Sequence, residues 1–313
     1  MRQHGIQLGA QGREHTMDPI TRIDRSLLAA LALGEAPVGA LGGPPRLAAA
    51  VRHAVFPGGA RVRPRLCLAV AMACGHDDPA LTDAAAVALE LLHCASLVHD
   101  DLPCFDDSPT RRGVPSVHNA FGERLAVLAG DALIVLGFQA LAAAPALHPA
   151  RLPKLLGLIA RGVGQPHGIV AGQAWECEPQ VSLRDYQRAK TGALFAAAAM
   201  AGAESAGGAG APWQALGEWL GEAYQVADDI RDVAADPVLL GKPTGQDLAL
   251  GRPSVAAAQG LAGAVAHFQQ LVQRAASSVP DCPGAQRLRA LVWAESERLV
   301  PAALCDRLAQ AAA

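Results

Sequence analysis

The chain has 313 residues, of which 51% are hydrophobic, 4% are aromatic and 18% are charged, with a formal net charge of −3 at pH 7. A chain of this length can bury one large core. Nucleic-acid binding requires concentrated basic surface, which neither the net charge nor any local run supplies, so we expect no nucleic-acid partner. The seven cysteines form no Cys-x-x-Cys pair, which favours reduced core residues in a cytoplasmic protein.

The N-terminal segment is polar and contains no apolar run of the kind found in signal peptides. We therefore expect residues 1–16 to be a disordered lead-in and residues 17–313 to form one domain. No run of 18 uninterrupted apolar residues occurs, and the nearest candidate, residues 193–211, contains Glu204. We accordingly expect no membrane span.

Apolar residues recur at i, i+3 and i+4 along most of the chain, and no segment shows sustained alternation of apolar and polar residues. This periodicity predicts an all-α fold. Proline and glycine clusters mark the ends of the predicted helices. In chain order, these helices cover residues 18–33, 45–54, 61–74, 79–101, 116–143, 149–173, 182–202, 212–234, 252–277 and 284–309.

The fourth predicted helix ends in acidic residues, which the negative C-terminal end of a helix dipole disfavours. Asp100 and Asp101 end this helix, and Asp106 follows shortly after. Pro103 disfavours helical geometry at Leu102, so Asp106 should leave the helix and bend back toward Asp100 from a loop. A positive group is therefore expected beside these carboxylates.

A second acidic cluster, Asp228, Asp229 and Asp232, lies near the end of the helix predicted at 212–234. Residues four apart on a helix project from one face about 6 Å apart, so Asp228 and Asp232 could share a metal ion. Arg231 falls between these positions and should face elsewhere. Carboxylates are hard ligands suited to Mg²⁺, and two such clusters could hold a polyphosphate between them. For either cluster alone, a solvated acidic helix end is the alternative.

Several basic residues are available to meet these acids or a bound phosphate. They are Arg61, Arg63, Arg65, Arg111, Arg112, Lys190 and Lys242. Taken singly, each could be a solvated surface charge. The polar, glycine-flanked loop at 241–247 could close over a ligand or could be an ordinary connection.

Six motifs occur in a fixed order: Gly58-Gly59-x-Arg61-x-Arg63-Pro64, Asp100-Asp101-x4-Asp106, Arg111-Arg112-Gly113, Gly172-Gln173, Lys190-Thr191, and Gln225-x-x-Asp228-Asp229-x-x-Asp232. From about Asp18 onward the chain resembles the trans-isoprenyl diphosphate synthases, and most closely the bacterial geranylgeranyl diphosphate synthases of the carotenoid pathway. The resemblance implies a single-domain helical bundle around a central cavity, and a homodimer. It also implies head-to-tail condensation of isopentenyl diphosphate with an allylic diphosphate, giving geranylgeranyl diphosphate and pyrophosphate.

The resemblance also implies roles for individual residues. About three Mg²⁺ ions would be held by Asp100, Asp106 and Asp228, and the acidic clusters would be completed by Asp101, Asp229 and Asp232. The isopentenyl diphosphate site would be formed by Arg63, His93 and Arg112. The allylic side would be formed by Arg111, Lys190, Thr191, Gln225 and Lys242.

One departure from the family pattern concerns the Gly-Gly motif, where Ala60 replaces the usual lysine. A contact to isopentenyl diphosphate is then missing, unless Arg61 reaches into the site instead. Product length is expected to depend on Ala95 and Ser96, since a bulky aromatic at either position closes the family's pocket at fifteen carbons. Both residues are small, which favours the twenty-carbon product and a deeper pocket floor, on the helix containing Leu133 to Phe138.

The resemblance leaves alternatives open. The product could be farnesyl diphosphate or another chain length. A terpenoid cyclase or head-to-head condensing enzyme would share the fold and the acidic clusters, but would not need a separate isopentenyl diphosphate site. A non-catalytic partner subunit is expected to lose acidic ligands, and here all of them are present.

Overall fold

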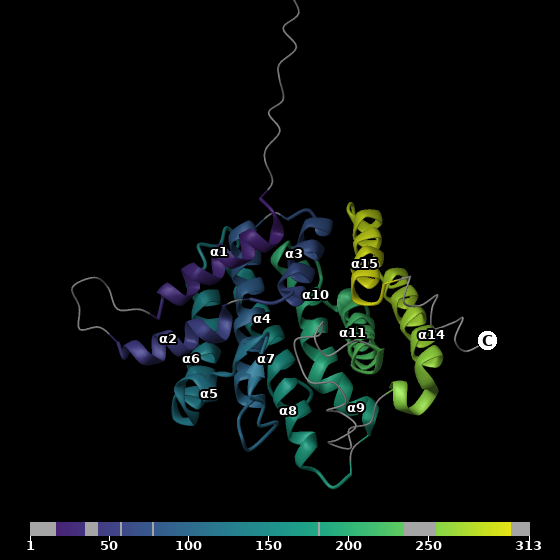
Figure 1. Cartoon of the computed structure of the whole chain (residues 1–313). Coiled ribbons are helices and arrows are strands. Elements are labelled where there is room, and N and C mark those ends of the chain that lie inside the picture. The colour runs from purple at the N-terminus through teal and green to yellow at the C-terminus, as the bar shows by residue number, and fades with distance from the viewer. Residues whose placement is uncertain are drawn as a thin grey trace, which may run out of the picture.

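The structure is a computed structural model that describes residues 17–34, 43–56, 58–76, 78–180, 182–234 and 255–301, without the side chains of residues 183, 184, 232–234 and 257. Within these ranges the chain is all-α, apart from one short antiparallel hairpin that pairs β1 (Thr110–Arg111) with β2 (Val114–Pro115) (Figure 1). The predicted fold class is therefore confirmed. The expected lead-in at 1–16, Lys242 and the loop at 241–247 lie outside the described residues.

The first half of the chain supplies α1 (Pro19–Ala32), α2 (Pro45–Val55), α3 (Val62–Cys74), α4 (Pro79–Asp100), α5 (Val117–Phe121) and α6 (Glu123–Ala142). Local chemistry explains where two of these helices begin. The Asp18 carboxylate accepts a hydrogen bond from the backbone N–H of Thr21, and Asp78 does the same for Leu81. Each cap is followed by a proline at the first helical position, which needs no N–H partner there.

The second half supplies α7 (Leu152–Val163), α8 (Ile169–Ala174), α9 (Leu183–Gln187), α10 (Ala193–Ser205), α11 (Gln214–Ala234), α14 (Val255–Ser277) and α15 (Ala285–Leu299). Short 3₁₀ turns lie at Pro149–Arg151, Trp175–Cys177 and Ala211–Trp213. A π-helical turn at Arg188–Gly192 leads into α10. Such turns inside helices are frequent at functional sites.

Four of the predicted helices are interrupted in the structure. The helix predicted at 252–277 is kinked at Gly260, which has a φ of 71°. The helix predicted at 116–143 is divided by Gly122, whose φ of 89° lies in a region that glycine tolerates and other residues avoid. The helix predicted at 149–173 is divided into α7 and α8. The helix predicted at 182–202 contains the π-helical turn. The hairpin of β1 and β2 was not predicted, because each strand is too short to show an alternating pattern.

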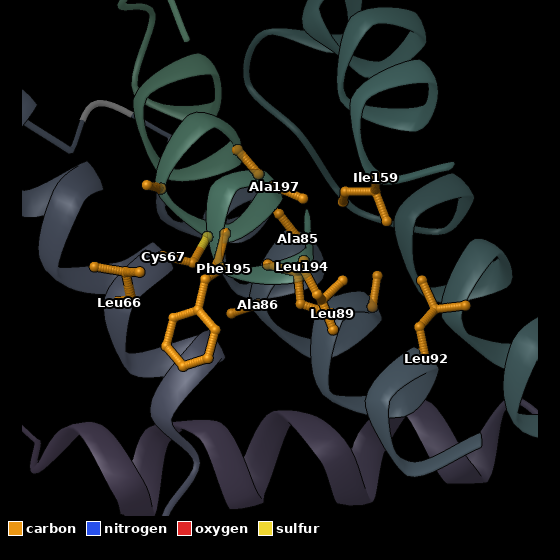
Figure 2. Close-up of a cluster of buried hydrophobic side chains, with 14 of the residues drawn as sticks. Leu66, Cys67, Ala85, Ala86, Leu89, Leu92, Ile159, Leu194, Phe195 and Ala197 are labelled. Atoms are coloured by element: carbon orange, nitrogen blue, oxygen red, sulfur yellow. The ribbon is translucent and has the colours of Figure 1, made fainter. Parts of the chain in front are cut away.

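The core is built around α4 and α10, which are apolar on nearly all sides and buried along most of their length. Figure 2 shows α10 residues Leu194 and Phe195 beside Cys67 of α3 and Leu89 of α4. Small residues let the helices approach closely. A Cβ atom on Gly202 would lie only 2.4 Å from the carbonyl oxygen of Cys67. Dense packing of this kind fixes α10 firmly against α3.

Two helices of the described chain, α4 and α6, are long and apolar enough to cross a membrane by length and composition. In the most apolar window of α4, 78% of the residues are buried inside the protein, whereas the corresponding value for α6 is 44%. The burial of α4 is typical of the core helix of a folded domain, which passes the same test as a membrane span.

Candidate active site

The chain folds back on itself directly after α4. The backbone N–H of Asp106 donates to the carbonyl oxygen of Asp100 at 2.9 Å, and the N–H of Ser108 donates to that of Asp101 at 3.2 Å. These bonds satisfy carbonyl groups that have no partner within the helix. The predicted return of Asp106 toward Asp100 is therefore confirmed.

Three carboxylates converge at this turn. One oxygen each of Asp100, Asp106 and Glu176 lies within 4.8 Å of the others. Glu176 comes from the 3₁₀ turn that follows α8, and sequence analysis did not identify it. The available signal was its position shortly after Gly172-Gln173, and the Gln173 amide itself donates to Asp100 at 3.1 Å.

Lys190 supplies the positive charge expected beside these acids. Its Nζ atom lies 3.3 Å from Asp100 and 2.5 Å from Glu176. Burial disfavours the charged amine, but the charge of Asp100, with Tyr186 and Glu176, outweighs this effect and raises the Lys190 pKa above its ordinary value. The π-helical turn that carries Lys190 passes very close to α8. A Cβ atom on Gly172 would lie 2.3 Å from the backbone nitrogen of Lys190, so this position requires glycine.

Asp101 faces a different partner. Its side chain is buried and accepts hydrogen bonds at 3.0 and 3.2 Å from Nε of Arg111, which lies on β1. Burial opposes the charge on Arg111, but the hydrogen bond and charge of Asp101 raise its pKa above the ordinary value. Asp101 therefore anchors the hairpin to the end of α4, while Asp100 and Asp106 face Glu176 and Lys190.

A second charged group lies about two turns earlier on α4, where Arg63 meets His93. Nη1 of Arg63 lies 3.2 Å from Nε2 of His93, and its guanidinium carbon lies 4.6 Å from the centre of the Phe195 ring. Nε of Arg63 is buried without a hydrogen-bond partner among the described residues. Burial lowers the pKa of Arg63, and burial followed by the charges of Arg63 and Arg112 holds the His93 pKa well below its ordinary value. His93 is thus neutral and can accept a hydrogen bond from Arg63.

The placement of Arg61 differs from the expectation that it could contact substrate. Its side chain is 1% exposed and donates to Glu90 at 2.7 Å, to Asp24 at 3.1 Å and to the carbonyl oxygen of Val55 at 2.9 Å. These contacts engage the guanidinium from three directions. Arg61 is therefore part of a buried ion-pair group in this structure. It does not supply the substrate contact of the lysine that Ala60 replaces.

The second acidic cluster lies on α11. Asp228 forms an ion pair at 3.2 Å with Arg231, which corrects the expectation that Arg231 faces elsewhere. Asp229 is buried and accepts hydrogen bonds from the Gln225 side chain at 3.1 Å and from the backbone N–H of Val255 at 2.9 Å. It thereby caps α14. The side chain of Asp232 lies outside the described part of the chain.

The remaining predicted residues lie near these two groups. The Thr191 hydroxyl donates to Gln225 at 3.2 Å, which links the π-helical turn to α11. On α4, Ala95 is 1% exposed, and the Ser96 hydroxyl donates to the carbonyl oxygen of His93 at 2.8 Å. Gln173 of α8 also donates to the carbonyl oxygen of Ser96, at 3.4 Å, so Ser96 lies beside α8, one turn before Asp100.

The geometry thus combines a carboxylate group with an adjacent lysine, and a buried arginine that has no carboxylate partner among the described residues. A sequence profile of polyprenyl synthetases matches residues 44–287. This chain belongs to the polyprenyl synthetase family. Among known proteins, this polyprenyl synthetase is 51% identical over 287 residues to a geranylgeranyl diphosphate synthase of Cereibacter sphaeroides, covering 92% of this chain and 98% of the relative. The same enzyme of Rhodobacter capsulatus is 49% identical, covering 89% and 95%.

Solved structures agree with this assignment. The geranylgeranyl pyrophosphate synthetase of Pyrococcus horikoshii superposes with a TM-score of 0.74 at 28% identity, covering 90% of this polyprenyl synthetase and 95% of that chain. A geranyltransferase of Helicobacter pylori, solved with magnesium and isoprenyl diphosphate, gives the same TM-score and identity, covering 91% and 100%. The all-helical fold of this protein is thus that of its family.

Proposed function

We propose that this polyprenyl synthetase is a geranylgeranyl diphosphate synthase, which transfers an allylic prenyl group to isopentenyl diphosphate and releases pyrophosphate. The observation that carries the proposal is the presence of two charged sites along α4, one suited to metal ions and one suited to an anion. At its end, Asp100, Asp106 and Glu176 lie beside Lys190. About two turns earlier on the helix, neutral His93 lies beside the buried Arg63 of α3. A condensing enzyme needs two such sites, whereas a cyclase needs one.

The residues at the first site fit Mg²⁺. Their donor set consists of carboxylate oxygens within 4.8 Å of one another, which is the ligand chemistry that Mg²⁺ prefers. Asp100, Asp106 and Glu176 would hold magnesium on this side, and Asp228 would do so from α11. When bound, Mg²⁺ neutralises the charge of a diphosphate and favours its departure. About three ions are expected from the family resemblance.

The residues of this chain would act mainly by binding and orientation. Lys190, Arg111, Thr191 and Gln225 would hold the allylic diphosphate, whose charge increases as the carbon–oxygen bond breaks. Groups already oriented toward that charge stabilise the transition state more than the ground state. Arg63 and Arg112 would hold isopentenyl diphosphate so that its double bond attacks the allylic carbon. No covalent nucleophile is required.

The twenty-carbon product is supported by the small residues Ala95 and Ser96 next to the site, and by the names of the two bacterial relatives. A chain that grows from the metal site along α4 passes these residues at about 6–7.5 Å along the helix axis. Neither side chain is large enough to stop it at fifteen carbons. We further propose a role in carotenoid biosynthesis and a cytoplasmic location, both on the family resemblance.

We also propose a homodimer, which the outer face of α6 supports. Val127, Leu128 and Val135 are 43%, 51% and 55% exposed on this helix. Apolar residues gathered on one helix are typical of surfaces that pair with another protein. A groove of about 450 Å³ lies beside them, between α2 and α6, and its walls include Val51 and Leu136.

Release of pyrophosphate from purified protein tests the proposed reaction. With Mg²⁺, isopentenyl diphosphate and farnesyl diphosphate, we expect turnover that is lost in EDTA. Asp100→Asn keeps the side-chain size while it removes the charge, and it should lower turnover by at least ~10²-fold. Asp281→Asn is the matched control, because Asp281 is fully exposed far along the chain. Full activity of Asp100→Asn, or of the wild type in EDTA, would reject the metal-dependent reaction.

A further inference from the structure

Glu90 is a buried carboxylate on α4 that the proposed reaction does not use. Its side chain is 2% exposed, and one of its oxygens, Oε1, lies 2.7 Å from Nη1 of Arg61 and 3.7 Å from Nη2 of Arg112. Arg61 precedes α3, and Arg112 lies in the turn of the β1–β2 hairpin. One carboxylate therefore joins two segments that are distant in sequence. A buried charge is costly unless it has such partners, so the position demands an explanation.

Both arginines have unusual backbone conformations. Arg61 has a φ of 48° and Arg112 a φ of 55°. Both values lie in the left-handed region, which residues other than glycine, asparagine and aspartate rarely adopt. Strained residues of this kind persist only where surrounding contacts determine them. The ion pairs to Glu90 are contacts that Arg61 and Arg112 share.

Gly59 completes the setting of Arg112. A Cβ atom at residue 59 would lie 2.9 Å from two atoms of the Arg112 guanidinium, so this group lies directly against the glycine backbone. Arg112 is thus confined between Gly59 on one side and Glu90 on the other. Ala60 supplies no charge beside them, so in the proposed reaction Arg63 and Arg112 are the cations that bind the diphosphate here.

We propose that Glu90 is a positioning residue for isopentenyl diphosphate, acting through Arg112; this inference rests on the proposed function. The charge of Glu90 by itself opposes the binding of an anion, whereas its hold on Arg112 favours binding by fixing the guanidinium before the ligand arrives. The two effects change the affinity for isopentenyl diphosphate in opposite directions. Removing the charge of Glu90 therefore shows which effect is larger.

The test measures the Michaelis constants for both substrates in Glu90→Gln and Glu90→Asp. In Glu90→Gln we expect the KM for isopentenyl diphosphate to rise at least ~10-fold, the scale of one charge-assisted contact, while the KM for the allylic diphosphate changes less than ~2-fold. Glu90→Asp keeps the charge and should give an intermediate value. Asp83→Asn is the control. Asp83 lies on the same helix as Glu90, and it forms an ion pair at 2.7 Å with Arg22 of α1, away from both sites.

Gly59→Ala provides a second route should Glu90→Gln fail to fold. The added methyl meets the end of a flexible side chain, so it should displace the Arg112 guanidinium and raise the same KM with little change in melting temperature. An unchanged or lower KM for isopentenyl diphosphate in folded Glu90→Gln, or an equal rise in both constants, would overturn the positioning role. An unchanged KM in Gly59→Ala would do the same. Absence of condensation by the wild type would instead reject the proposed function.

Discussion

Replacement of Arg63 by methionine should stabilise the protein and abolish its binding of isopentenyl diphosphate. Arg63 is 8% exposed, its Nε has no hydrogen-bond partner among the described residues, and burial lowers its pKa. The contacts that it does make are with neutral His93 and with the ring of Phe195. A cation in this setting is stabilised fully only when an anion binds. Methionine fills similar volume without a charge.

The expected magnitude follows from these contacts. Loss of the hydrogen bond to His93 and of the contact with Phe195 costs about 1–2 kcal/mol together. Removing the desolvation penalty of a buried charge gains several kcal/mol, roughly 3–4. The net gain of about 1–3 kcal/mol should raise the melting temperature by roughly 2–12 °C, since 1 kcal/mol corresponds to about 2–4 °C in a large domain.

Thermal unfolding with and without isopentenyl diphosphate measures both effects. A ligand at 100 times its Kd stabilises the wild type by about 2.7 kcal/mol, and it should leave Arg63→Met unchanged. Arg65→Met is the matched control, because Arg65 is paired with Glu295 and partly exposed, so its removal should cost at most about 1 kcal/mol. A lower melting temperature of Arg63→Met without ligand, or equal stabilisation of both proteins by ligand, would refute this reasoning.

Other predictions concern the metal site, the product and pH. Glu176→Gln should raise the Mg²⁺ concentration needed for half-maximal turnover at least ~10-fold; an unchanged requirement would remove Glu176 from the metal site. Ala95→Phe should shift the product toward farnesyl diphosphate while condensation continues, and chromatography that shows an unchanged length would place the pocket floor elsewhere. The folded-state pKa of His93 is lowered, so neutral His93 is fully compatible with folding above pH ~6.5. Below that pH the free energy of unfolding should fall, by up to ~1.4 kcal/mol per pH unit. His93→Gln should reduce this slope in pH-dependent denaturant unfolding, and an unchanged slope would contradict it.

Local rules were sufficient for the turn after α4. Pro103 and the polarity of the α4 end depend only on neighbouring residues, so the return of Asp106 and the need for a cation could be predicted from sequence. The caps at Asp18 and Asp78 also depend only on neighbouring residues, although the sequence analysis did not name them. Gly122 shows the limit of such rules, because an isolated glycine inside an apolar helical pattern is often tolerated. Its positive φ occurs where α5 ends and α6 begins.

Tertiary contacts decided the features that sequence analysis missed or misplaced. Arg61 matches a binding motif, but Asp24 from α1 and Glu90 from α4 enclose it in the core. Arg231 lies between two ligand positions, yet its long side chain reaches Asp228. Glu176 belongs to no acidic run, and it reaches the site because the turn after α8 lies beside the end of α4. Spacing along one helix contains none of this information.

The identity of the product formed by purified wild-type protein tests the central claim most directly. Radiolabelled isopentenyl diphosphate and farnesyl diphosphate would be incubated with Mg²⁺, and the dephosphorylated products separated by chromatography. We predict mainly geranylgeraniol, with one pyrophosphate released for each condensation and no product when EDTA is present. Absence of labelled prenyl product despite a folded, magnesium-loaded protein, or a product mainly of fifteen carbons when geranyl diphosphate is the primer, would contradict the assignment as a geranylgeranyl diphosphate synthase.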